Sequence, residues 1–412
     1  MRRQLERVEQ FAVQVIFDRE RGKRAALLRG FLHALSKLYG AIAFVRVRLF
    51  QHNLKSRHFL GVTVVSIGNL TVGGTGKTPV VERLARELHA AGCAVAILSR
   101  GYKSRRLPLL RAWRYRLTKT ADPLLGSRVV SDGRDVRLDS YEAGDEPFML
   151  ATNLPGVPVI VDKDRARAGR LAIERFGSRV LLLDDGFQYL RLNRRYDFVL
   201  VDCQAPFGNG FLLPRGMLRE APEALRRASL IILTKAGGQD QTELIADIRQ
   251  HQPTAPIVVC DHHPLYLQQL GGDEQLPLEF LDGKHVAALS GIAAPESFER
   301  FVTRYGAVIE VRRRYADHHR FSPAEIESLV ERCRRRDLHA VITTEKDAVR
   351  IPMRALAEIP FYYLKVEIDI QQGREEWQEW VRRLSGPESA SGRQPGGWIT
   401  LTPDERKREA AG

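Results

Sequence analysis

The segment Gly68–Pro79, GNLTVGGTGKTP, carries the clearest chemical signal in the sequence. It follows the apolar run Val62–Ile67 and precedes Pro79–Ala91, whose apolar residues recur with helical spacing. A glycine-rich loop between a strand and a helix turns backbone N–H groups toward a phosphate, and the helix N-terminus adds partial positive charge. We therefore predict a nucleotide-binding loop made of Thr71, Val72, Gly73, Gly74, Thr75, Gly76, Lys77 and Thr78.

Two side chains of this loop have separate predicted roles. Lys77 would reach the β- and γ-phosphates, and the hydroxyl of Thr78 would bind Mg²⁺. Thr71 replaces the first glycine of the usual G-x-x-x-x-G-K-[ST] pattern, but Gly73 and Gly74 supply backbone freedom nearby.

The same features favour ATP over GTP as the nucleotide. GTPases specify guanine with an Asn/Thr-Lys-x-Asp strand end, and the nearest match here, ILTKAGG, has Gly237 in place of the aspartate. Partitioning ATPases carry a signature lysine where this chain has Val72. That difference weakens the alternative interpretation of the chain as a membrane-associated P-loop ATPase switch.

Two acidic pairs lie beside predicted elements of regular structure. Asp184 and Asp185 end the buried strand in VLLLDDGFQ. Two adjacent carboxylates are costly there unless they meet a cation, so we predict a Mg²⁺ site. Asp145 and Glu146 open a helix in GDEPFML, where acidic residues also act as N-terminal caps, so their role stays open on this evidence alone.

Seven motifs, taken in order, resemble one family, the tetraacyldisaccharide 4'-kinases of lipid A biosynthesis. They are VSIGNLTVGGTGKTP, LSRGYKS, VSDGR, AGDEP, LLLDDGFQ, LLPRGMLREA and TTEKDAV, and the resemblance runs from about Leu35 to about Leu384. It implies transfer of the ATP γ-phosphate to the 4'-hydroxyl of a tetraacylated glucosamine disaccharide 1-phosphate. The product would be the 4'-phosphorylated lipid A precursor, and the implied cofactors are ATP and Mg²⁺.

The resemblance also implies roles for individual residues. Asp145 matches the general base, and the histidine of YADHHRF matches its partner in a catalytic dyad. We assign that partner to His318, with His319 as the alternative, and Lys77 completes the catalytic set. The resemblance further implies Mg²⁺ ligands at Thr78, Asp184, Asp185 and Glu220, and contacts with phosphates or substrate at Asn69, Tyr102 and Arg219.

Alternating strands and helices predict an α/β fold, with a P-loop NTPase-like parallel sheet covered by helices on both faces. A second series of strands and helices, after the polar stretch Asp261–Gly283, predicts a smaller C-terminal α/β domain. The predicted organisation is an N-terminal extension with an amphipathic helix (1–58), a P-loop ATP-binding kinase domain (59–262), a linker (263–283), the smaller domain (284–384) and a disordered tail (385–412).

Residues from about 25 to 50 are predicted to form an amphipathic helix at the N-terminus. Basic residues gather on one face (Arg29, His33, Lys37), and the charge-free stretch Leu38–Val45 is too short to span a membrane. The helix could lie in the membrane interface or pack on the domain behind it, and a lipid substrate favours the interface. The apolar residues at helical spacing are Leu28, Phe31, Leu32, Leu35, Leu38, Tyr39, Ile42 and Val45.

Composition limits the compartment and the partners. The net charge of +14 suits an anionic membrane surface, and no aromatic-interleaved motif supports nucleic-acid binding. The four cysteines form no C-x-x-C pair, which argues against a zinc site or a disulfide framework. We expect a peripheral (monotopic) protein on the cytoplasmic face of the inner membrane. Its partners would be the lipid A disaccharide precursor and the anionic membrane surface, with no nucleic acid and no protein partner.

Overall fold

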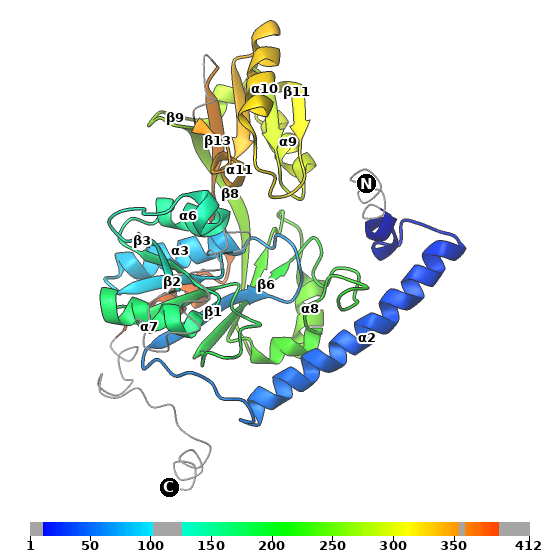
Figure 1. The fold of residues 1–412 in the computed structure, drawn as a ribbon, viewed down its shortest axis with the longest axis vertical. Helices are drawn as coiled ribbons and strands as arrows, with labels where there is room; N and C mark the ends of the chain where they lie inside the picture. Colours follow the sequence, from blue (N-terminus) through cyan, green and yellow to red (C-terminus); the bar gives the residue numbers. More distant parts are fainter. Residues whose placement is uncertain (1–10, 102–125, 354–358, 387–412) are drawn as a thin grey trace.

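The computed structural model describes residues 11–101, 126–353 and 359–386 of the 412-residue chain. These residues form a larger lobe and a smaller lobe, joined by two long strands that run from one lobe into the other (Figure 1). A single sheet of thirteen strands extends through both lobes of the described chain. The predicted fold class, a parallel α/β sheet with helices on both faces plus a smaller α/β unit, is confirmed.

The larger lobe is built on a mostly parallel sheet in the order β3-β4-β2-β5-β1-β6-β7-β8, in which only β3–β4 is antiparallel. Helices cover both faces of this sheet, so the central strands β1 and β5 are buried along their whole length. The bounds are β1 (Thr63–Asn69), β2 (Val95–Ser99), β3 (Arg128–Asp132), β4 (Pro158–Val161), β5 (Val180–Asp184), β6 (Tyr196–Asp202), β7 (Leu230–Thr234) and β8 (Ile257–Gln269).

Three helices cover one face of this sheet and two cover the other. Buried residues alternate between the faces along each strand. Val65 and Leu182, for example, join one core cluster, and Val64 and Leu181 join another. The first group is α3 (Lys77–Ala90), α6 (Asp145–Asn153) and α12 (Arg374–Ser385), and the second is α7 (Arg165–Phe176) and α8 (Thr242–His251). The short helices α5 (Ser140–Ala143) and η1 (Pro222–Arg227) lie in connections.

Two long antiparallel strands connect the lobes. β8 pairs with β7 at its start and then with β13 (Phe361–Gln372) over most of its length. The predicted linker 263–283 therefore begins as strand up to Gln269, and it also contains β9 (Gln275–Leu276) and the short helix η2 (Leu278–Leu281). Polar composition suggested a loop, but the ladder with β13 satisfies the backbone hydrogen bonds of this segment.

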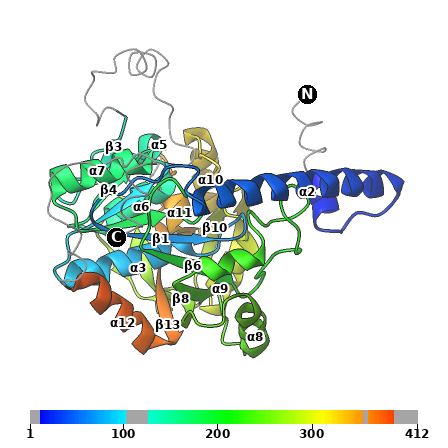
Figure 2. The same ribbon diagram turned by 90° about the horizontal axis from the view of Figure 1, so that it is seen from below.

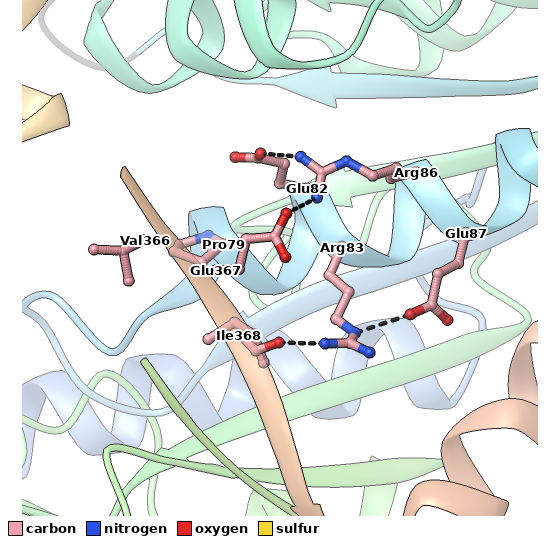
Figure 3. A pocket seen from close by; sticks show the side chains of 8 residues that line it. All are labelled: Pro79, Glu82, Arg83, Arg86, Glu87, Val366, Glu367 and Ile368. Atoms are coloured by element: carbon pink, nitrogen blue, oxygen red, sulfur yellow. Dashed lines mark hydrogen bonds and ion pairs between the residues drawn. The ribbon is translucent and has the colours of Figure 1, made fainter. Parts of the chain in front are cut away.

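Ion pairs fasten the connecting strand β13 to α3 (Figure 3). Arg86 pairs with Glu367 on β13 and with Glu82 on its own helix, while Arg83 pairs with Glu87 and donates to the carbonyl oxygen of Ile368. These groups line a cavity of about 190 Å³ whose two arginines both have carboxylate partners. The helix that starts at the predicted nucleotide loop is thus tied directly to the strand that leads into the smaller lobe.

The smaller lobe repeats the layered arrangement on a smaller scale. Its strands run in the order β11-β10-β12-β13, with all pairs parallel. α9 packs on one face through Phe298 and Val302, and α10 packs on the other through Ile326 and Leu329. The bounds are β10 (His285–Ser290), α9 (Pro295–Arg304), β11 (Val308–Arg314), α10 (Pro323–Arg335), β12 (Ala340–Thr344) and α11 (Glu345–Ala348).

The helix α12 follows the smaller lobe in sequence but packs on the larger one. Trp377 and Trp380 belong to the same core cluster as β1 and α3, and Nε1 of Trp377 donates to Oε2 of Glu87 at 2.7 Å. The sequence assigned this helix to the smaller domain (284–384). The apolar side of α12 shows that the helix needs a packing partner but does not identify it. β13 returns the chain to the larger lobe, and α12 therefore packs there.

The helix α2 (Lys23–Gln51) lies along the larger lobe and extends beyond it (Figure 2). Small and polar residues make its contacts with the lobe. Ser36 Oγ donates to the carbonyl oxygen of Leu212 at 2.8 Å, and Tyr39 donates to that of Arg219 at 3.0 Å. Gly40 approaches Leu212 so closely that an added Cβ would lie 2.8 Å from its side chain. The polar and small side of this helix therefore faces the protein.

The opposite side of α2 is apolar and exposed. Since successive residues turn by about 100°, Ser36 and Gly40 lie opposite the residues we call the α2 stripe, which are 53–76% exposed. Of the basic residues expected to face lipid phosphates, Arg29 instead pairs with Asp18, and His33 packs edge-on against Phe211. In the described ranges no helix is long and apolar enough to cross a bilayer. The α2 stripe consists of Leu27, Phe31, Leu38, Ile42 and Val45.

Candidate active site

The predicted nucleotide loop joins the end of β1 to the start of α3. Gly73 and Gly76 have φ angles of 111° and 76°, a region that favours glycine. Thr71 instead forms an antiparallel bridge with Leu218, so this position does not need the glycine of the usual pattern. α3 begins at Lys77, and the free N–H groups of its first turn follow the loop directly. This arrangement suits an anion.

Lys77 lies between two groups that end neighbouring strands. Its Nζ is 3.1 Å from Oδ1 of Asn69 at the end of β1 and 3.6 Å from Oδ1 of Asp185 just after β5. Thr78 is the next residue of α3. The structure therefore brings Asn69, Lys77 and Asp185 to one point at the carboxyl edge of the sheet, where ligands bind in open α/β folds.

The side chain of Arg219 lies beside Asp185 at this edge of the sheet. Its Nη1 donates to both carboxylate oxygens of Asp185 at 2.9 Å and to Oε1 of Gln188 at 3.3 Å, while its backbone N–H donates to the carbonyl of Leu70. Gln188 in turn donates from Nε2 to the carbonyl of Asn69 at 3.0 Å. Sequence reasoning gave Gln188 no role. Gln188 follows the aspartate pair in LLLDDGFQ, and this closeness in sequence is the signal that could have identified it as a site residue.

The carboxylate pair Asp184 and Asp185 carries charge that protein groups balance only in part. Ser99 donates to Oδ2 of Asp184 at 3.0 Å, but Oδ1 is buried without a partner in the described structure. Burial, followed by the charges of Glu146 and Asp185, raises the pKa of Asp184 to about 7. Burial would also raise the pKa of Asp185, but Lys77 and Arg219 lower it below its ordinary value.

This pair fits a magnesium ion. The described residues contain no cluster of three His, Cys, Asp or Glu side chains placed to hold a metal. Mg²⁺, however, often takes only one or two carboxylates and completes its shell with water and substrate phosphates. The unpartnered oxygen of Asp184 and the uncompensated negative charge around it are what a divalent cation would relieve.

Glu220, the fourth predicted Mg²⁺ ligand, has another partner. Its Oε2 accepts a hydrogen bond from Nη2 of Arg227 at 2.6 Å, so its charge is already balanced. Arg227 also lies over the ring of Phe187 at 4.1 Å. The contacts of Glu220 therefore do not join it to the Asp184–Asp185 pair. Tyr102, predicted to contact substrate, lies outside the described residues.

Asp145 and His318 meet between the lobes. Asp145 is the first residue of α6 in the larger lobe and is 5% exposed, and His318 follows β11 in the smaller lobe. His318 Nδ1 lies 3.0 Å from Oδ2 of Asp145. The neighbouring His319 instead contacts the Glu325 carboxylate at 3.2 Å and stacks on Tyr315, a local structural arrangement. Of the two histidines, His318 has the geometry of a dyad partner.

Two arginines that the sequence analysis did not assign complete this cluster. Arg350, whose side chain is fully buried, donates from Nε to Oδ2 of Asp145 at 2.8 Å and from Nη1 to Oδ1 of Asp347 at 3.0 Å. Arg320 lies 3.2 Å from Oδ1 of Asp145. Burial would raise the pKa of Asp145, but His318, Arg350 and Arg320 together lower it below its ordinary value. The carboxylate is therefore ionised at neutral pH.

Lys235, the residue after β7, contacts the nucleotide loop. Its Nζ lies 2.6 Å from the carbonyl oxygen of Gly74 and 2.5 Å from Oδ2 of Asp202, and Thr234 Oγ1 donates to the carbonyl of Thr75 at 2.9 Å. The strand end ILTK thus braces the loop, although it lacks the aspartate that specifies guanine. Sequence reasoning tested this motif only for guanine specificity and missed its role in loop support.

Backbone strain gathers at this site. Six described residues other than glycine have positive φ, and three of them are Asp185, Lys235 and His318, with values of 50°, 57° and 64°. Such conformations cost free energy, of order 1–3 kcal/mol each, and persist where the surrounding structure imposes them, often at functional sites. The positive φ angles of Asp185, Lys235 and His318 thus fall at residues that make the contacts described above.

Comparisons with known proteins give one family over most of the chain. A family model described as tetraacyldisaccharide-1-P 4'-kinase matches residues 28–385. The tetraacyldisaccharide 4'-kinase of Syntrophus aciditrophicus is 37% identical over 82% of this chain and 89% of its own length, and that of Anaeromyxobacter dehalogenans is 39% identical over 88% and 92%. A solved structure described as the "apo" form of LpxK from Aquifex aeolicus in complex with ATP matches with a TM-score of 0.68 and 27% identity, covering 87% of this chain and all of that one. The chain belongs to the tetraacyldisaccharide-1-P 4'-kinase family.

Proposed function

We propose that this chain is an ATP-dependent lipid kinase. It transfers the γ-phosphate of ATP to the 4'-hydroxyl of a tetraacylated glucosamine disaccharide 1-phosphate and so makes the 4'-phosphorylated lipid A precursor. The observation that carries the proposal is the 3.0 Å contact between Asp145 and His318. Besides burial, the charge of Glu146, the residue after Asp145, raises the pKa of Asp184 at the end of β5, which connects this contact with the sheet edge. Family membership supports the same reaction.

The nucleotide-binding part of the proposal rests on the loop after β1. Its backbone N–H groups and the start of α3 receive the phosphates, and Lys77 neutralises charge on the transferred phosphoryl group. The ATP named for the similar LpxK structure supports ATP as the donor. Arg219 and Asn69, both within one contact of Asp185 or Lys77, position the phosphates and the acceptor.

Thr78, Asp184 and Asp185 are the residues that would hold Mg²⁺. The ion would supply charge neutralisation to the phosphate oxygens. Ser99 keeps the Asp184 carboxylate in place, and Arg219 does the same for Asp185. Glu220, whose carboxylate is paired with Arg227, acts by holding the loop that carries Arg219.

Asp145 is the proposed general base. A sugar hydroxyl is a weak nucleophile, so a carboxylate within hydrogen-bond reach accepts its proton as the new O–P bond forms and the bond from the γ-phosphorus to the β–γ bridging oxygen breaks. ADP leaves with that oxygen. His318 holds the carboxylate in orientation, and Arg350 keeps it ionised inside a buried setting.

The α2 stripe supports a peripheral position on an anionic membrane. A helix whose polar side binds the protein and whose apolar side faces outward has the arrangement of an interfacial helix, with its apolar side in the acyl layer. A lipid acceptor is held in the same layer. On this basis we place the protein on the cytoplasmic face of the inner membrane, where ATP is available.

One assay tests the function directly. Purified protein, labelled ATP, Mg²⁺ and the tetraacylated disaccharide 1-phosphate in mixed micelles are expected to give a labelled lipid, with ATP turnover that depends on the acceptor. ATP hydrolysis that is independent of the lipid, with no labelled lipid product, would contradict the proposal. Replacing Leu27, Phe31 and Ile42 of the α2 stripe by Ser is expected to release the protein from anionic vesicles without changing ATP affinity.

A further inference from the structure

The N-terminal segment, residues 11–22, is fixed to the larger lobe by a buried arginine. Arg215 lies in the connection between β6 and η1 and is 5% exposed. Its Nη2 donates to both carboxylate oxygens of Asp18, at 2.9 and 2.7 Å, and its Nη1 donates to the carbonyl oxygen of Ile16 at 2.7 Å. Asn209 of the same connection donates to that carbonyl at 2.8 Å. Hydrogen bonds assisted by charge therefore hold the segment in place.

The turn at Asp18 is built around this contact. Asp18 has a φ angle of 57°, a conformation that costs a residue other than glycine free energy. Arg29 on α2 approaches the same carboxylate, with Nε 3.5 Å from Oδ1, and Val15 of the segment is fully buried. The family model begins at residue 28, so the segment lies outside the part of the chain that it matches. Family membership therefore does not account for these contacts.

The loop that receives the segment, residues 207–219, also contacts the nucleotide loop, and we call it the arginine loop. Arg219, whose side chain donates to the Asp185 carboxylate, ends this loop four residues after Arg215. The place of Arg215 is thus linked to that of Arg219 through a short stretch of chain. Its backbone contacts with the nucleotide loop and the preceding strand end are Val72 N–H to the carbonyl of Met217 at 2.8 Å, the bridge between Thr71 and Leu218, and Arg219 N–H to the carbonyl of Leu70 at 2.6 Å.

The arginine loop depends on such contacts for its conformation. It contains no helix or named strand of its own, and Gly208 and Gly210 have φ angles of 61° and 77°. A loop of this kind holds one conformation when other parts of the protein offset the entropy lost by ordering it. α2 contributes hydrogen bonds between neutral groups, from Ser36 and Tyr39. The contact with Asp18 differs because it joins two opposite charges.

We propose that Asp18 is a positioning residue for phosphoryl transfer. Its carboxylate fixes Arg215, Arg215 fixes the arginine loop, and the loop holds Arg219 against Asp185. This inference rests on the proposed function, in which Asp185 and Arg219 meet Mg²⁺ and the phosphates. Asp18 acts through Arg215 and not on the reacting atoms. The segment before the family match thereby sets how well the nucleotide site is ordered.

Asp18→Asn tests the inference while keeping the turn. The side chain of Asp18 is 48% exposed, and asparagine adopts a positive φ more readily than most residues. Hydrogen–deuterium exchange of the full chain without ligands reports the loop directly. Exchange at the amides of Val72 and Arg219 is expected to be about fivefold faster, the upper end of the effect of losing a partly exposed ion pair.

Glu20→Gln is the matched control for Asp18→Asn. It removes the same charge from the same segment, and it keeps the backbone carbonyl of Glu20 to which Arg29 donates. Exchange in the arginine loop should stay as in the wild type. Arg215→Ala removes the other partner of the ion pair and should accelerate exchange at least as much as Asp18→Asn.

Kinase kinetics distinguish positioning of Arg219 from a general effect on the fold. Asp18→Asn should lower kcat by about fivefold, and Glu20→Gln should leave it unchanged. In an Arg219→Ala background, Asp18→Asn should add no further loss, because the two residues act in one chain of contacts. Binding of Asp18→Asn to phosphatidylglycerol vesicles should equal that of the wild type.

Other outcomes would overturn the inference. Unchanged exchange in Asp18→Asn would mean that the arginine loop does not depend on the segment. A loss of kcat that persists in the Arg219→Ala background would assign the effect to another group, and equal effects in Glu20→Gln would reduce it to net charge. Weaker vesicle binding with unchanged exchange would make the segment a membrane anchor. Failure of the wild type to label the lipid would contradict the proposed function, whereas the exchange experiment needs no substrate and tests the contact separately.

Discussion

Nδ1 of His318 lies 3.0 Å from Oδ2 of Asp145, although the two residues are 173 positions apart and belong to different lobes. The contact exists because β8 and β13 carry the smaller lobe over the carboxyl edge of the large sheet, where α6 begins. In the proposed function this pair is a base built from two lobes, so we expect the relative position of the lobes to control whether Asp145 is oriented for chemistry.

Lys77→Ala is expected to abolish phosphoryl transfer. Lys77 is the cation at the start of α3, 3.6 Å from Asp185, and an alanine leaves the phosphates without that charge. The measurement is kcat with labelled ATP and the lipid acceptor. Retention of more than about a tenth of the wild-type kcat would show that another cation does the work, since losses from removing one such donor are about 10²-fold or more.

Arg350→Lys is expected to lower kcat by about tenfold or more while leaving the KM for ATP unchanged. Lysine keeps the charge but cannot donate at the same time to Asp145 and Asp347, as the arginine fork does. Arg350→Met would remove the buried cation that Asp145 and Asp347 share, and should destabilise the fold by about 3–5 kcal/mol even though Asp145 keeps Arg320 and His318. A Lys variant with wild-type kcat would limit Arg350 to a structural role. Arg336→Lys, on the surface of the smaller lobe, is the control.

Arg320→Ala is expected to shift the acid limb of the kcat/KM profile to higher pH. In the native protein the pKa of Asp145 is lowered, so the ionised carboxylate contributes stability and activity at neutral pH, and both are lost as the pH falls through its folded value. Burial opposes the cations, so removing Arg320, 3.2 Å away, raises that pKa. Identical profiles for the variant and the wild type would mean that Asp145 does not set the acid limb.

Trp377→Ala is expected to destabilise the larger lobe by about 3–5 kcal/mol. Trp377 is 2% exposed, packs in the core cluster that contains α3, and donates to Glu87. Chemical denaturation monitors the loss. Glu379→Ala on the exposed side of the same helix, where the side chain is 66% exposed, should change stability by less than about 0.5 kcal/mol. Equal midpoints for the two variants would contradict the packing role of α12.

The sequence predicts those parts of the site that are formed by residues contiguous in the chain. The loop Thr71–Thr78 and the pair Asp184–Asp185 each follow an apolar strand, so their position at the sheet edge follows from the strand pattern. Arg350 could not be found this way, because its partner Asp145 is 205 positions away and because it lies one residue after the end of the motif TTEKDAV.

The same limit explains the placement of α12 and α2. Amphipathic spacing shows that one side of a helix needs an apolar environment, but it does not say whether the protein or a membrane supplies it. Trp377 packs in the core of the larger lobe, whereas the side chains of Phe31 and Ile42 on α2 are 60% and 61% exposed. Glu220 shows a related limit, since the sequence places it beside Arg219 but does not show that its carboxylate accepts from Arg227, and its role at Mg²⁺ stays a prediction.

The last prediction concerns the dyad as a unit. Asp145→Asn keeps the shape of the side chain but removes the base, and His318→Ala removes the group that orients it. Each is expected to lower kcat by about 10² or more and to leave ATP affinity nearly unchanged.

The double variant should cost little more than the worse single variant, because residues that act together are not additive. His319→Ala is the matched control: its imidazole contacts Glu325 and Tyr315, so kcat should stay close to that of the wild type. Losses that multiply in the double variant would mean two independent roles. A deficit in His319→Ala as large as that of His318→Ala would move the dyad to the neighbouring histidine, against the geometry that joins His318 to Asp145.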